Sequence, residues 1–312
     1  MCIICRNQNL TGLKELKCDD CELLINIPNI EGLKVLYCPF NSISNIPNIK
    51  GLRHITCNDC PFLINIPHIK GLTYLDCNSC DLLTEIPNIE GLGILDCHDC
   101  PSLIIIPNIK GLKNLDCYNC ESLTIIPNIE GLSQLNCFNC PLLTNIPHIE
   151  TLVNLICFRC PLITKIPHID GLKYLNCSNC PSLTTISNIE GLRELYCSNC
   201  PLLTTIPNIK GLYTLDCYDC ELLTSIPNIE GLEYLGCYNC PLLITIFNIE
   251  GLKCLTCHTC PLLMYIPKCK YNKYDRKLLK LSYKGCKYLT SKKMDKLYNN
   301  IYYLWKSYKL KK

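Results

Sequence analysis

The chain has 312 residues, a nearly balanced formal charge of +3 and 30 cysteines. No stretch approaches the ~18 consecutive apolar residues of a membrane span, and the first residues lack the basic start and apolar core of a secretory signal. Gly-rich phosphate loops, nucleophile elbows and H-E-x-x-H motifs are also missing, so the sequence predicts neither an enzyme nor a cofactor.

Cysteine usage bears on the compartment. Without a signal the default is a reducing compartment, where most thiols stay free. The sequence therefore predicts a cytoplasmic or nuclear protein that is not secreted. The tripeptide Asn9-Leu10-Thr11 is a glycosylation sequon, which points the other way, but so short a pattern often arises by chance.

Residues 1–11 form the first predicted element, a degenerate N-terminal cap that contains Cys2 and Cys5. From Gly12 to residue 270 follow thirteen units of the form G-L-x-x-L-x-C-x-x-C-P-x-L-x-x-I-P-N-I-E/K. We number the positions of each unit from 1, the usual glycine, to 20. The second unit, Gly32 to Lys50, is one residue shorter than the others.

The L-x-x-L-x-C stretch alternates apolar and variable residues, which predicts a short strand with one buried face. Proline at position 17, as in Pro67 and Pro207, blocks a helix interior and predicts an extended or turn-like return. One unit cannot bury its Leu and Ile residues alone. Stacked units can, so the pattern predicts a solenoid with one parallel sheet.

This pattern resembles that of the leucine-rich-repeat family over residues 10–270. The second unit shows the family pattern most clearly, at Leu33, Leu36, Cys38, Asn41, Ile43, Ile46 and Pro47. The resemblance implies a horseshoe-shaped solenoid with its sheet on the concave side, a mostly extended and turn-like convex side, and binding of a protein partner by the concave side. The cysteine-rich form and the basic tail also resemble leucine-rich-repeat proteins of giant DNA viruses such as mimiviruses, which would place the chain in a host cytoplasm.

Two cysteine columns run through the units, at position 7 from Cys18 to Cys257 and at position 10 from Cys21 to Cys260, with Asn41 as the exception. Two C-x-x-C pairs from neighbouring units could supply four thiolates to zinc, which would make this a zinc-binding or metal-storing protein. Alternatively, position 7 is a small buried residue and position 10 bonds the backbone of the corner. Asn41 favours the structural interpretation and no metal site, because asparagine can bond the same backbone but cannot replace a thiolate.

If positions 5 and 7 point inward, positions 4, 6 and 8 point outward onto the concave face. Eight of the ten tyrosines in the units lie there. Exposed aromatic residues are typical interface anchors. Tyrosine and phenylalanine also have a high strand propensity, which would place them here without any binding role. The stacked aspartates at position 6 indicate either a basic partner or a solvated face. The predicted binding residues are Tyr74, Asp76, Asp96, Asp116, Tyr118, Phe138, Phe158, Tyr174, Tyr196, Tyr218, Tyr234 and Tyr238. His68, His148 and His168 replace the usual asparagine of position 18 and are expected to be loop residues.

The last element, residues 271–312, holds 13 Lys/Arg and 2 Asp, a net +11, which leaves a net −8 for residues 1–270. Met294, Leu297 and Ile301 begin an apolar stripe at helical spacing, which predicts a helix over about 291–309. Such a helix could cap the last unit. The basic charge could instead contact nucleic acid or an anionic surface.

Overall fold

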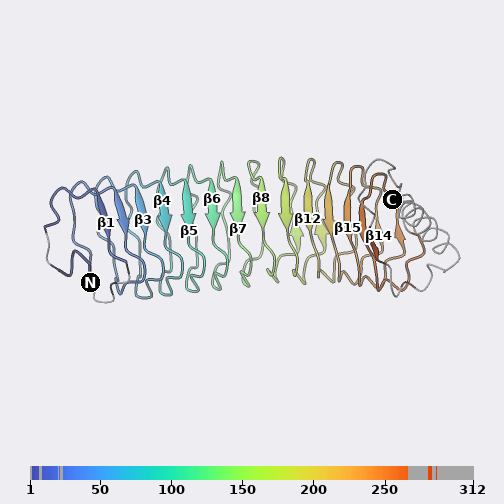
Figure 1. Ribbon diagram of the computed structural model, residues 1–312, viewed down its shortest axis with the longest axis horizontal. Helices are drawn as coiled ribbons and strands as arrows, with labels where there is room; N and C mark the ends of the chain where they lie inside the picture. The colour runs from blue at the N-terminus through green and yellow to red at the C-terminus, as the bar shows by residue number, and fades with distance from the viewer. Residues whose placement is uncertain are drawn as a thin grey trace, which may run out of the picture.

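Each 20-residue unit contributes one three-residue strand, at positions 4 to 6, and these strands pair in parallel. The computed structural model describes residues 2–6, 9–19, 21, 24–265, 280–282 and 286, and the strands make it a parallel β-solenoid of about twelve turns (Figure 1). In sheet order the strands of the units are β1 (Glu15–Lys17), β2 (Val35–Tyr37), β3 (His54–Thr56), β4 (Tyr74–Asp76), β5 (Ile94–Asp96), β6 (Asn114–Asp116), β7 (Gln134–Asn136), β8 (Asn154–Ile156), β10 (Tyr174–Asn176), β12 (Glu194–Tyr196), β13 (Thr214–Asp216), β15 (Tyr234–Gly236) and β17 (Cys254–Thr256).

The register of the sheet aligns equal positions of neighbouring units. Leu115 pairs with Leu135, and Leu135 with Leu155. Figure 1 shows the resulting row of strands along the long axis of the molecule. Because the register never slips, every position of the repeat becomes a straight column of side chains, and the chemistry of a column can be read directly from the sequence.

Seven columns make the core. Positions 2, 5, 7, 10, 13, 16 and 19 are buried in nearly every described unit, and the predicted inward orientation of positions 5 and 7 is confirmed by Leu135 and Cys137, which are 1% and 0% exposed. Burial of one leucine side chain contributes about 2 kcal/mol. No unit could enclose these residues alone, since each column packs on the unit before and the unit after.

The chain leaves each strand of the sheet through a corner at position 9. From Phe40 to Thr259, all twelve described residues at this position have φ between 52° and 59°. Asparagine and aspartate tolerate this left-handed conformation best among residues with a side chain, which explains why they dominate position 9. The asparagine amides at this position also link neighbouring units, as in the bond from Asn119 Nδ2 to Asp99 Oδ1 at 2.7 Å.

The return half of the unit is extended, as predicted, and pairs only in short stretches. Two small parallel sheets form there, and isolated bridges such as Glu85 to Ile105 continue the pattern. The paired strands are β9 (Lys165–Ile166) with β11 (Thr185–Ile186), and β14 (Ser225–Ile226) with β16 (Thr245–Ile246). Proline at position 17 lacks the N–H that a longer ladder would require.

Residues outside the thirteen units pack on the core at one end of the solenoid and extend the sheet at the other. Ile3 and Ile4 pack against the core at the N-terminal end. At the other end, β18 (Lys280–Ser282) pairs with β17 and aligns Leu281 with Leu255, so a further strand lies beyond residue 270.

The described residues contain no α-helix, and within them no helix is long and apolar enough to cross a bilayer. The helix predicted over 291–309 lies outside the described residues, so the cap stays a prediction.

Candidate functional site

The outward face of the long sheet carries a shallow depression near its middle. It has a volume of about 360 Å³ and crosses strands β6, β7, β8 and β10. Positions 4 and 6 of four consecutive units line it, with the apolar Ile156 among the polar residues Asn114, Asp116, Gln134, Asn136, Asn154 and Tyr174. The Oδ1 atom of Asn136 is buried in this lining and accepts no hydrogen bond from the described residues.

An aromatic row borders the depression, two residues further along the same units. The rings of Tyr118 and Phe138 stack at 4.3 Å, and those of Phe138 and Phe158 at 4.4 Å. Tyr118, Phe138 and Phe158, three of the predicted binding residues, therefore form one stacked row. His98 extends it at one end by stacking on Tyr118 at 4.2 Å, and the guanidinium of Arg159 lies 6.0 Å from the Phe158 ring at the other. The rings are half-buried, so one edge of the row stays available to a partner.

The other predicted aromatic residues form separate small groups along the sheet. Tyr74 stacks on His54, and Tyr174 lies 5.5 Å from Tyr196. Near the C-terminal end, the predicted Tyr218, Tyr238 and Tyr234 are joined by two further rings. The pairs there are Tyr218 with Tyr238 at 4.6 Å, Tyr238 with His258 at 4.6 Å, and Tyr234 with Tyr213 at 5.2 Å. The sequence prediction considered only tyrosine and phenylalanine on this face. It therefore missed His54, His98 and His258, which occupy the same columns.

The three aspartates of position 6 lie in register on β4, β5 and β6. Burial, and then the charge of Asp96, raise the pKa of Asp76 and of Asp116 above the ordinary carboxyl value. Asp96 differs from the other two aspartates in its hydrogen-bond partner, because Nδ1 of His98 donates a hydrogen bond to the Asp96 carboxylate. Burial lowers the pKa of His98, but Asp96 outweighs it, so the net pKa of His98 is raised. The column therefore places three carboxylates in register on the outward face, with one of them bonded to a histidine.

Asp216 occupies position 6 further along the sheet, and its carboxylate lies over Gly236, in space that a β-carbon would fill. Burial raises its pKa to about 6. The charged form is therefore penalised only in the folded state, so stability falls as the pH rises from about 4 to above 6. After a discount for its half-exposed position, we expect Asp216→Asn to raise the free energy of unfolding by about 1–2 kcal/mol at pH 8 and by almost nothing at pH 4.

Urea unfolding at the two pH values measures this difference. Asp81→Asn, on an exposed carboxylate in a different unit, is the matched control and should change stability by less than about 0.5 kcal/mol at both pH values. Equal effects of Asp216→Asn at pH 4 and pH 8 would contradict the raised pKa.

The cysteines of position 10 tie each unit to the one before it. Cys140 Sγ donates to the carbonyl oxygen of Cys117 at 3.2 Å, and the equivalent bond recurs at 3.2 to 3.4 Å from Cys60 to Cys260. Asn41 makes the same link, from Nδ2 to the oxygens of Cys18 and Pro39 at 2.7 and 2.5 Å. The predicted backbone role of position 10 is confirmed.

The cysteines of position 7 in the interior units are buried and unreactive. Burial raises the pKa of thiols such as Cys97 and Cys137 well above the ordinary value, so they stay protonated and unreactive. Within the described residues, one group of three cysteines could hold a metal ion: Cys2, Cys5 and Cys21, at the N-terminal end.

Two of the three histidines at position 18, which were expected to be loop residues, bond the backbone of the next unit. Nδ1 of His148 donates to the carbonyl oxygen of His168, and Nδ1 of His168 to that of Asn188, both at 2.6 Å. Nε2 of His168 also lies 2.9 Å from the carboxylate of Asp170. These contacts place the rings in loops that link one unit to the next.

Position 12 presents an exposed apolar column that the sequence interpretation passed over. Its members are 39% to 55% exposed and lie just after the corner: Phe62, Leu82, Leu142, Leu162, Leu202, Leu222 and Leu242. The sequence contains evidence for this column, because position 12 is apolar in most units. The neighbouring position 13 already supplies the buried leucine, so the residue at position 12 is left exposed. Nothing in the described residues covers this column.

Comparison with protein-family models found no match, and comparison with curated proteins also found none. The fold and the candidate surface therefore stand on the chain's own residues. The binding role of the predicted residues stays a prediction, as does an anionic partner for the basic tail.

Proposed function

We propose that the chain is a non-enzymatic scaffold of the leucine-rich-repeat kind, which binds a protein partner through the outward, concave face of its long sheet. The observation that carries this proposal is the depression over β6 to β10 with the aromatic row at its border. Interfaces concentrate their binding energy in a few rigid aromatic anchors surrounded by polar groups, and this surface has that composition.

The charge of the surface favours a basic partner. Asp76, Asp96 and Asp116 stand in one column beside the row, and residues 1–270 carry a net −8. Burial and the neighbouring Asp96 raise the pKa of Asp76 and of Asp116, despite hydrogen bonds from Asn78 and Asn136. A lysine or arginine side chain of a partner would stabilise the charged forms of these carboxylates and would also speed association.

The central aromatic ring should carry a large share of the binding energy. We expect Phe138→Ala to cost about 2 kcal/mol of binding free energy, or about thirtyfold in Kd. The partner would be obtained by affinity purification from the native cell with identification by mass spectrometry, and calorimetry of the purified pair would then measure the affinity.

Ile105→Ala is the matched control, because Ile105 is an apolar residue 55% exposed on the return half of its unit. It should leave Kd unchanged. If Phe138→Ala binds as tightly as the unchanged protein, or if Ile105→Ala is the variant that loses binding, recognition occurs elsewhere than on the sheet face.

A further inference from the structure

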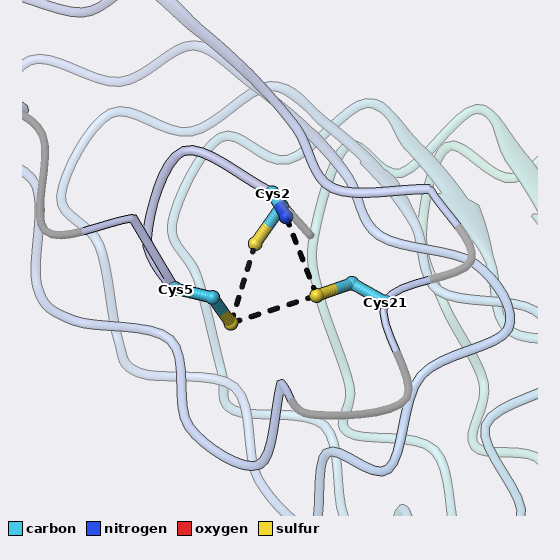
Figure 2. A group of neighbouring side chains, drawn as sticks. All are labelled: Cys2, Cys5 and Cys21. Atoms are coloured by element: carbon cyan, nitrogen blue, oxygen red, sulfur yellow. Dashed lines mark hydrogen bonds between the residues drawn. The ribbon is translucent and has the colours of Figure 1, made fainter.

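The N-terminal end of the solenoid gathers cysteines from two separate segments. Cys2 and Cys5 come from the loop that covers the first unit, and Cys21 comes from the corner of that unit. Figure 2 shows the three side chains converging, with their sulfur atoms toward one another. All three are free thiols in the structure.

The distances between these sulfurs match those of a tetrahedral metal site. Sγ of Cys5 lies 3.8 Å from Sγ of Cys2 and 3.5 Å from Sγ of Cys21. In a tetrahedral site with zinc–sulfur bonds of about 2.3 Å, two sulfurs are about 3.8 Å apart. A disulfide needs about 2.05 Å, so the group is spaced for a shared ion rather than for a direct bond.

A fourth thiol, that of Cys18, lies beside Cys2 but outside the three sulfurs that are within 4.8 Å of one another. Cys18 belongs to the same C-x-x-C pair as Cys21, and its thiol interacts electrostatically with those of Cys2 and Cys21. The residues therefore read C-x-x-C, twelve intervening residues, then C-x-x-C. Two such halves brought together are a common way to assemble four thiolate ligands for zinc.

The first unit differs from the later ones in what its position 10 bonds. In later units this sulfur donates its proton to the backbone of the unit before, as Cys140 does to Cys117. Cys21 instead accepts a hydrogen bond, from the backbone N–H of Cys2 at 3.4 Å. An N–H donor at the sulfur stabilises a thiolate, as outer hydrogen bonds do around metal ligands. The sulfur of Cys21 therefore faces the N-terminal loop, whereas the position 10 sulfurs of later units face the backbone of the unit before.

We propose that Cys2, Cys5, Cys18 and Cys21 form a structural zinc site that closes the N-terminal end of the solenoid. Binding replaces four thiol protons by one Zn²⁺, and the protons pass to solvent. The ion joins the N-terminal loop to the first unit. It covers the end of the core in the way that terminal caps do in other solenoids.

The full chain, expressed with zinc and purified under reducing conditions, tests this proposal. We expect one zinc per chain by atomic emission, and X-ray absorption at the zinc edge should show four sulfur neighbours at about 2.3 Å. The variant Cys2→Ser with Cys5→Ser should retain almost no zinc while keeping the circular dichroism of the unchanged chain, because the later units do not depend on the loop.

Cys140→Asn is the matched control, since Asn41 shows that asparagine fills position 10, and it should retain the single zinc. The proposal is overturned if the unchanged chain binds no zinc, if the double variant keeps it, or if several zincs bind per chain. A disulfide between Cys5 and Cys21, found by mass spectrometry after alkylation, would also overturn it. If the double variant fails to fold, the sulfur count in the unchanged chain decides, and a shell with fewer than four sulfurs overturns the four-cysteine site.

Discussion

Replacing Leu135 by alanine is expected to lower the free energy of unfolding by about 3 kcal/mol. Leu135 is 1% exposed and lies at the centre of β7, between Leu115 and Leu155. The lost methyl groups leave a cavity that touches the units on both sides. Because a solenoid is stabilised by contacts between neighbours, this cavity weakens two interfaces at once. Urea denaturation followed by circular dichroism measures the effect.

Phe138→Ala, in the same unit, is the control that tests the assignment of faces. The Phe138 ring is half-buried and stacks on Tyr118 and Phe158. Loss of these stacks should cost about 1 kcal/mol, well below the effect of Leu135→Ala. A larger loss of stability from Phe138→Ala than from Leu135→Ala would mean that the aromatic row belongs to the core, and would remove it as a binding surface.

Asn41→Ala should lower the free energy of unfolding by about 2–3 kcal/mol. Asn41 is 2% exposed, and its Nδ2 atom bonds the carbonyl oxygens of Cys18 and Pro39. Alanine removes both bonds, and each buried carbonyl then lacks a partner, at about 1–3 kcal/mol apiece. The damage lies between the first and second units, so partial unfolding should begin at the N-terminal end, where hydrogen exchange can locate it.

Cys140→Ala is the comparison for Asn41→Ala, because Cys140 makes the equivalent link through a weak thiol donor. It should cost less than Asn41→Ala, about 1 kcal/mol. Equal costs for the two variants would show that filling the corner, rather than bonding the backbone, explains position 10.

The columns of the solenoid could be predicted because the repeat is regular. With Leu115 and Leu135 at the same position of successive units, an in-register parallel sheet is the arrangement that buries both. The aromatic row followed from the same reasoning, since Tyr118, Phe138 and Phe158 share position 8. Asn41 indicated the role of position 10, because a single exchange distinguishes a backbone bond from a metal ligand.

The regular 20-residue pattern could not predict the structure beyond the end of the repeat. β18 follows β17 at a spacing of 26 residues rather than 20, with Leu281 in register with Leu255. Cys286 then takes the role of position 10, because its Sγ atom bonds the carbonyl oxygen of Cys257 at 2.9 Å. An irregular spacer hides such a unit from a periodic search, because pairing depends on contact in space and not on a fixed count of residues.

By itself, the sequence determined which side chains are buried, which columns face outward and which residues share a column, because one register governs every turn. Only the tertiary structure decided which atoms meet across units and at the ends. The carbonyl that each position 10 thiol bonds lies in the unit before, and the partner of Asp96 is the ring of His98. The convergence of Cys2 and Cys5 on Cys21 depends on how a non-repeating loop folds back. The spacing of these three cysteines as a group recurs nowhere else in the chain, so only the path of the N-terminal loop brings them together.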